Sequence, residues 1–136
     1  MKIIGFSFDK LSIEKRSNDF KELKIDRNVS ILNVEKIKSE SIQIKDEILS
    51  IKFSYSIEYK PKIADISFSG NVLITADQKI IKDFLREWKN KKFPEEYKLS
   101  IFNLILRKSD IKALELEDDL GLPVHVNLPL VREQKS

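Results

Sequence analysis

The sequence predicts an α+β domain, in which an antiparallel sheet of about four strands from the N-terminal half packs on two or three helices from the C-terminal half. Apolar and polar residues alternate through residues 51–60 and 64–74, as in a hairpin with one solvated face. From residue 80 onward apolar residues recur at helical spacing. The length of 136 residues fits one domain, which we place at residues 1–131, followed by a frayed tail at 132–136.

The first strand is expected at the N-terminus, where apolar residues alternate with small or polar ones over residues 4–8. The alternation resumes in the opposite phase at residues 11–13, which predicts a β-bulge near Asp9-Lys10. Residues 14–28 are polar and interrupted, so we expect a connection there. A second strand is predicted at residues 29–34.

The hairpin is the clearest pattern in the chain, and its two arms meet at a turn around Pro61. The aromatic residues of its arms can be read as a platform on which bases stack, as in RNA-binding sheets. They share their faces with isoleucines, so we interpret them as core instead. These residues are Phe53, Tyr55, Tyr59 and Phe68.

The helices begin after Asp77, a good N-cap for an amphipathic helix that ends near Trp88. Phe93-Pro94 interrupts the pattern, and a second helix restarts at the proline. Residues 97–106 are apolar on nearly all sides, which predicts burial by the sheet and by a second copy of the chain. Ser109-Asp110 can cap a further short helix, although a strand there is also possible.

The C-terminal segment, residues 121–131, is expected to be extended because Pro123 and Pro129 oppose helix formation. Its apolar residues predict that it docks on the domain.

Composition excludes several classes of protein. The chain has no cysteine, so it has no disulfide, thiol nucleophile or cysteine-ligated metal. No apolar run reaches the roughly 18 residues of a membrane helix, and polar residues break the N-terminal segment too early for a signal peptide. We therefore expect a cytoplasmic protein with no membrane association. The net charge of +3 results from 25 basic and 22 acidic residues and is weak for a nucleic-acid binder.

Few residues suggest catalysis. His125 is the only histidine, and we interpret it as structural. The acidic residues Glu117, Asp118 and Asp119 can hold a divalent cation, but without defined spacing a solvated helix turn is the simpler interpretation. The three glycines are isolated, so no phosphate-binding loop is present. We predict a protein that is not an enzyme and that uses no metal or cofactor.

One basic stretch stands next to aromatic residues. Lys89, Lys91 and Lys92 lie between Trp88 and Phe93, a combination that can bind nucleic acid. The structural interpretation is that the lysines complement the helix dipole and that Trp88 belongs to the apolar stripe.

The predicted elements run in the order of a strand, an irregular crossing segment, further strands ending in a hairpin, two helices and an extended tail. Phe93-Pro94 precedes the main helix, and a Pro/Leu/Asn segment follows at 122–129. In this order and in these residues the chain resembles the SecB family of export chaperones. The resemblance implies an oligomer, a dimer or tetramer, with grooves that accept extended apolar segments. By the same analogy, the groove-lining residues are Phe20, Leu23, Trp88 and Phe93. Residues 132–136 do not resemble the acidic tail that these chaperones use towards their motor, so we expect no role in export through that motor.

The chain also resembles a family of short archaeal proteins that open with a Ser-Phe-like strand and close on paired Leu-Pro motifs. The matching residues are Phe6-Ser7-Phe8, Leu122-Pro123 and Leu128-Pro129. This resemblance implies no particular activity.

Two functional hypotheses follow. The first is a SecB-like chaperone or adaptor, a non-enzymatic module that holds extended polypeptide or a partner protein and forms a homo-oligomer. The second is a nucleic-acid-binding accessory protein that uses the basic turn at Lys89–Lys92.

Overall fold

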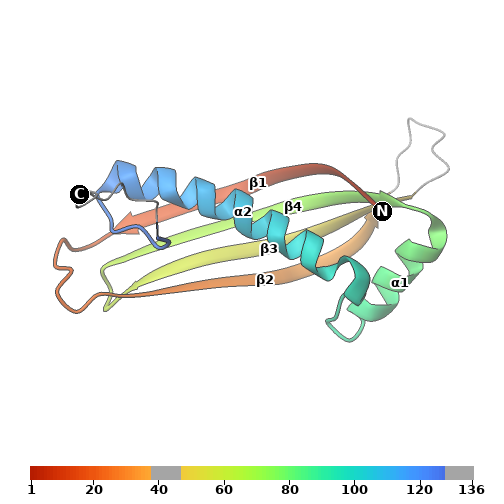
Figure 1. Cartoon of the computed structure of the whole chain (residues 1–136), viewed down its shortest axis with the longest axis horizontal. Coiled ribbons are helices and arrows are strands. Elements are labelled where there is room, and N and C mark those ends of the chain that lie inside the picture. Colours follow the sequence, from red (N-terminus) through yellow and green to blue (C-terminus); the bar gives the residue numbers. More distant parts are fainter. Residues whose placement is uncertain (38–46, 128–136) are drawn as a thin grey trace, which may run out of the picture.

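The computed structural model describes residues 1–37 and 47–127, and it confirms the expected α+β class (Figure 1). Four strands precede two helices in the chain. The elements are β1 (Lys2–Lys15), β2 (Lys24–Ile37), β3 (Glu47–Lys60), β4 (Ala64–Ala76), α1 (Gln78–Trp88) and α2 (Glu95–Leu120).

The strands form one antiparallel sheet in the order β1-β4-β3-β2. The predicted hairpin is confirmed as β3 and β4, the two central strands, with Ile57 opposite Ile66. The predicted bulge is also confirmed, because the pairing of β1 with β4 shifts between Phe8 and Lys10. The consecutive strands β1 and β2 lie at opposite edges, so the connection between them crosses one end of the sheet (Figure 1).

The predicted extent of β2 is wrong. The strand begins at Lys24 rather than at residue 29 and continues to Ile37, which leaves only residues 16–23 for the connection. Residues 24–28 read as a loop in the sequence because they are polar. Pairing with β3 supplies their backbone partners, from Lys24 opposite Lys60 onward. Pairing with a neighbouring strand overrides the weak local pattern.

Both helices cover the same face of the sheet, and α2 crosses it from one end to the other (Figure 1). The residues of β3 and β4 that face the helices are almost fully buried, whereas their neighbours on the other face are mostly polar, such as Lys52 and Glu58. The core has two parts. One lies near α1 and the N-terminal half of α2, and the other lies near the C-terminal half of α2.

Helix α1 begins as expected, with the Asp77 carboxylate accepting a hydrogen bond from the backbone N–H of Ile80 at 3.0 Å. Among the described residues no helix is long and apolar enough to cross a membrane.

Helix α2 is continuous over 26 residues, so the predicted separate helix starting at Ser109-Asp110 is wrong. A serine and an aspartate usually favour a helix start because their side chains compete for backbone N–H groups. Here Ser109 is buried towards the sheet, and Asp110 bonds to side chains of other elements. Neither side chain is available as a cap, and the helix passes through both residues.

The C-terminal end of α2 is closed by Gly121, whose φ of 64° lies in the left-handed region that favours glycine. The backbone N–H of Leu122 returns to the carbonyl of Glu117 at 2.9 Å. The Lys15 ammonium donates to the carbonyl of Leu120 at 2.7 Å, which satisfies a further carbonyl of the last turn.

The segment after Gly121 docks on the domain, as predicted for its described part, residues 122–127. It forms neither helix nor strand, Leu122 is buried, and the side chain of His125 is only 1% exposed. The predicted motif Leu128-Pro129 and the predicted frayed tail lie outside the described residues.

Candidate functional site

A groove of about 540 Å³ lies between β2 and the turn that joins α1 to α2. One wall is the edge strand, the other is formed by aromatic residues, and lysines stand at the rim. The lining residues are Val29, Ser30, Ile31, Trp88, Lys91, Lys92, Phe93, Glu95, Lys98 and Phe102.

The aromatic wall is held in place by the core. Phe93 is only 6% exposed, and its ring centroid lies 5.8 Å from that of Phe102 and 5.7 Å from that of Phe84, which is fully buried. Trp88 stands further out, 6.2 Å from Phe93 in an edge-to-face arrangement. The wall is therefore anchored at its base and half-exposed at Trp88.

The turn between the helices presents the lysines. Lys91 has a φ of 58°, an uncommon left-handed conformation for a residue with a side chain. This conformation lets the N–H of Lys92 return to the carbonyl of Glu87 at 3.0 Å, which closes α1. The Lys91 ammonium lies 4.5 Å from the ring centroid of Trp88, a cation–π contact.

The structure brings together four residues that the sequence singled out, although for two different hypotheses. Trp88 and Phe93, predicted to hold polypeptide, line the same groove as Lys91 and Lys92, predicted for nucleic acid. Lys89 ends α1 and does not line the groove.

Phe20 and Leu23 lie elsewhere. Both are half-buried and pack against the part of the core near the C-terminal half of α2, whereas Trp88 packs against the other part. The β1–β2 connection that carries them is at the opposite end of the molecule from the α1–α2 turn (Figure 1). The four residues implied by the SecB resemblance therefore do not form a single groove in this chain.

The sequence reasoning missed Val29, Ile31 and Phe102. The pattern predicts a strand for Val29 and Ile31, but nothing in it shows that this strand lies at the edge of the sheet beside the helix turn. Phe102 belongs to the predicted apolar helix, but the pattern does not show which neighbouring element its side chain faces.

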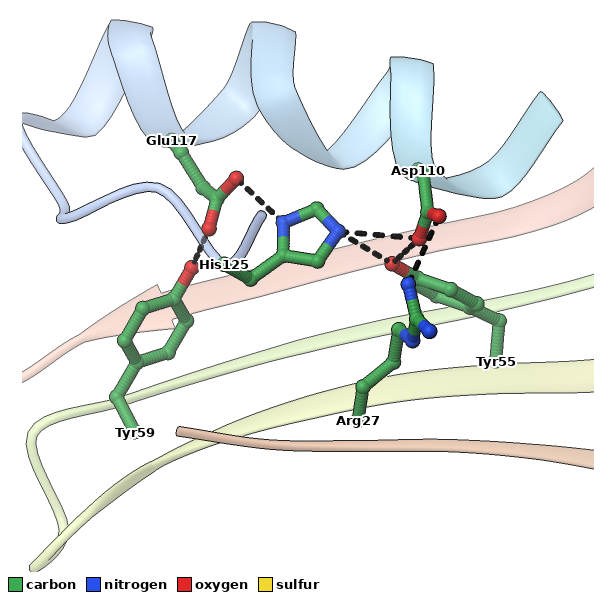
Figure 2. Close-up of polar contacts among 6 residues, drawn as sticks. All are labelled: Arg27, Tyr55, Tyr59, Asp110, Glu117 and His125. Carbon is green, nitrogen blue, oxygen red and sulfur yellow. Dashed lines mark hydrogen bonds and ion pairs between the residues drawn. The ribbon is translucent and has the colours of Figure 1, made fainter. Parts of the chain in front are cut away.

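A second concentration of polar side chains is buried between α2, β3 and the C-terminal segment (Figure 2). Glu117 is 0% exposed, and its carboxylate faces His125 Nδ1 at 2.7 Å from Oε1 and accepts a hydrogen bond from the Tyr59 hydroxyl on Oε2. The prediction that Glu117 is part of a solvated turn is wrong. Asp118 and Asp119, the other members of that acidic stretch, are exposed as expected.

The other ring nitrogen of His125 faces Asp110, with 3.0 Å between Nε2 and Oδ1. The Tyr55 hydroxyl donates to the same oxygen at 2.6 Å, and Arg27 reaches Oδ2 at 2.8 Å (Figure 2). We call these six residues the His125 cluster, which consists of Arg27, Tyr55, Tyr59, Asp110, Glu117 and His125.

The electrostatics of the His125 cluster favour a charged imidazole. Burial lowers the pKa of His125, but the hydrogen bonds to Glu117 and Asp110 outweigh burial and leave the pKa raised. Burial raises the pKa of Asp110. Hydrogen bonds from Tyr55 and His125, together with the charge of Arg27, lower this pKa by more than burial raises it, so the net shift is downward. Burial and the hydrogen bond to a carboxylate raise the pKa of both tyrosines, which stay neutral donors.

The arrangement accounts for the docking of the C-terminal segment, because an imidazolium bonded on both sides to carboxylates of α2 ties residue 125 to the helix. The interpretation of His125 as structural agrees with this geometry. Among the described residues no group of three or more His, Asp or Glu side chains is arranged to hold a metal ion.

No protein-family model and no curated protein matches this chain. A solved structure does match: the SecB-like chaperone Rv1957 of Mycobacterium tuberculosis in complex with a ChAD peptide from the antitoxin HigA1 (Rv1956). The TM-score is 0.54 at 14% sequence identity, and the alignment covers 98% of this chain and 92% of the other. The fold of this chain is therefore SecB-like, as the order of its elements predicted.

Proposed function

We propose that this protein is a non-enzymatic binding module that holds extended polypeptide segments in the groove between β2 and the α1–α2 turn. The observation that carries the proposal is the position of β2 at the edge of the sheet. Val29, Ser30 and Ile31 line the groove, and within residues 1–37 and 47–127 the only strand that pairs with β2 is β3. An edge strand directs part of its backbone N–H and C=O groups away from its partner, so an extended chain can pair with it as an added strand.

The side chains of the groove suit the same ligand. Trp88, Phe93 and Phe102 form an apolar wall opposite the strand, where a bulky side chain of the bound segment can be removed from water. The Mycobacterium tuberculosis chaperone of this fold was solved in complex with a peptide, which supports a polypeptide or protein partner here. The role is that of a chaperone or adaptor.

We also propose that the protein forms a homo-oligomer through α2. Leu99 is 73% exposed, and Leu104 and Leu106, which do not line the groove, are only half-buried. A second copy can cover this surface.

The test uses a fluorescein-labelled, permanently unfolded polypeptide and measures its binding by fluorescence anisotropy. Trp88 is the only tryptophan, so its emission gives a second signal from inside the groove. We expect Trp88→Ala to weaken binding at least tenfold. Leu11→Ala removes a partly exposed apolar side chain from β1, the opposite edge strand, and is expected to leave binding unchanged.

A third variant, Phe20→Ala, tests the other location implied by the SecB resemblance. Loss of binding in Phe20→Ala together with normal binding in Trp88→Ala would contradict the proposed groove. Absence of any binding by the unaltered protein, whose fold is checked by circular dichroism, would contradict the proposed function itself.

A further inference from the structure

The groove beside β2 is cationic as well as apolar. Three lysines line it, Lys91, Lys92 and Lys98, against a single carboxylate, that of Glu95. All three lysines are exposed, and none takes part in the ion pairs found within residues 1–37 and 47–127. Elsewhere among the described residues, some basic residues, such as Arg16, Arg27 and Lys60, have carboxylate partners, and others, such as Lys10 and Lys52, take part in no ion pair. The groove differs from these positions because three lysines line one apolar hollow. Within the described residues, three lysines against one carboxylate leave the groove with a net positive charge.

The backbone adds to this positive potential. Glu95, which lines the groove, is the first residue of the 26-residue helix α2. The N-cap residue is Pro94, whose side chain offers no acceptor to the first N–H groups of the helix. The N-terminal end of a helix carries a partial positive charge, which favours an anion close to it. Glu95 and Glu96 in the first turn of α2 offset part of this charge, so the lysines account for most of the positive potential at the groove.

The shape of the groove distinguishes an acidic polypeptide from a nucleic acid. The Lys91 ammonium lies 4.5 Å from the centroid of the Trp88 ring, and Phe93 is almost fully buried, so the flat ring faces that stacked bases need are partly covered, whereas an apolar side chain can also pack against ring edges. The opposite wall is the edge of β2 with Val29 and Ile31. Backbone pairing at a strand edge is specific to polypeptide.

We propose that the segment held in this groove is acidic: an extended polypeptide in which aspartate or glutamate residues flank one or two bulky apolar side chains. This inference rests on the proposed function and adds the chemistry of the partner. The apolar side chains pack on the wall formed by Trp88, Phe93 and Phe102. The flanking carboxylates pair with Lys92 and Lys98 at the rim. A basic segment would instead bring like charges together, which is unfavourable.

The experiment compares two labelled peptides of the same length and the same apolar residues. One carries Glu and Asp at its flanking positions, and the other carries Gln and Asn. An exposed ion pair is worth a factor of a few in affinity, so two or three of them predict about tenfold tighter binding of the acidic peptide. We also expect this advantage to shrink as the salt concentration rises, because exposed charges are screened.

A matched pair of variants locates the effect. Lys92→Gln/Lys98→Gln removes two positive charges from the groove, and we expect it to abolish most of the difference between the peptides. Lys10→Gln/Lys52→Gln removes the same net charge from two exposed positions outside the groove. This control is expected to retain the difference.

The outcomes separate the two levels of the proposal. Equal affinities for the acidic and amide peptides would overturn the acidic preference and leave polypeptide binding intact. Failure of both peptides to bind would contradict the proposed function. Tighter binding of a single-stranded oligonucleotide than of the acidic peptide, lost in Lys92→Gln/Lys98→Gln, would replace the polypeptide partner with a nucleic acid.

Discussion

Replacing His125 with alanine is expected to destabilise the protein strongly at neutral and mildly acidic pH. Among the described residues, the imidazole is the only positively charged partner of Glu117, whose side chain is 0% exposed. Of the contacts that the structure describes, His125→Ala leaves that carboxylate the hydrogen bond from the Tyr59 hydroxyl. Asp110 is less affected because it retains Arg27 and Tyr55.

The size of the effect follows from the burial of Glu117. Breaking a buried ion pair by removing one partner costs about 3–5 kcal/mol. The whole free energy of unfolding of a domain is about 5–15 kcal/mol. His125→Ala is thus expected to remove a large share of the stability. The exposed neighbour Asp118→Asn is the matched control, for which we expect a change within about 0.5 kcal/mol.

The pH dependence has a defined sign. The folded-state pKa of His125 is raised above the unfolded value of about 6.5. The stability that its charge supplies is therefore complete below about pH 6.5 and is lost as the pH rises through the folded-state pKa. Within that window the free energy of unfolding falls by at most about 1.4 kcal/mol per pH unit.

The assay is urea unfolding of the unaltered protein and of His125→Ala at pH 6 and pH 9, followed by circular dichroism. We expect the stability difference between the two proteins to be larger at pH 6 than at pH 9. A difference that is equal at both pH values, or larger at pH 9, would refute a charged imidazole between the two carboxylates.

Three further predictions concern single positions. Gly70→Ala is expected to lower the free energy of unfolding by about 1–3 kcal/mol, because a Cβ there would stand 2.9 Å from Phe53 Cζ and still closer to the backbone of β1. The control is Gly5→Ala, whose Cβ meets nothing closer than 3.4 Å. In thermal unfolding we expect Gly5→Ala to have a higher melting temperature than Gly70→Ala. Lys91→Gly removes the steric cost of the left-handed backbone at φ 58° and is expected to raise the free energy of unfolding by up to about 1 kcal/mol. The same variant is expected to bind the acidic peptide more weakly. A variant that is less stable and binds the acidic peptide with unchanged affinity would contradict both expectations. Leu99→Asp is expected to lower the molar mass measured by light scattering to that of a monomer, and an unchanged oligomer would show that α2 associates through another surface.

Much of the fold could be predicted because its elements have strong periodicity. The alternation through β3 and β4 identified the hairpin, and the spacing of apolar residues after Asp77 identified α1. The start of β2 could not be predicted in the same way. Its first residues are polar, and only their pairing with β3 makes them a strand.

One side of the groove could be predicted from the sequence, and the other could not. Trp88, Phe93 and the neighbouring lysines stood out because they are adjacent in sequence. The strand wall depends on which strand lies at the edge next to the helix turn, and that follows from the sheet order β1-β4-β3-β2. Local patterns contain no information about this order.

The sequence analysis did not predict the His125 cluster, although the spacing of residues along α2 indicates one of its members. Glu117 belongs to a row of buried residues spaced by four along α2, after Ile105, Ser109 and Ala113. A carboxylate in that row requires a partner, because an unpaired buried charge is very unfavourable. The partners come from β3 and from the segment after the helix, so only the tertiary structure identifies them.

The order of the strands has a consequence for folding kinetics. Lys15 pairs with Ala64 and Lys2 with Thr75, so the partners of the N-terminal strand lie far along the sequence. Contacts between residues far apart in sequence require the closure of long loops and slow the folding of a domain. The β3–β4 hairpin, by contrast, joins neighbouring segments and can form early. We expect β1 to add to the sheet late, as the step that sets the rate of folding.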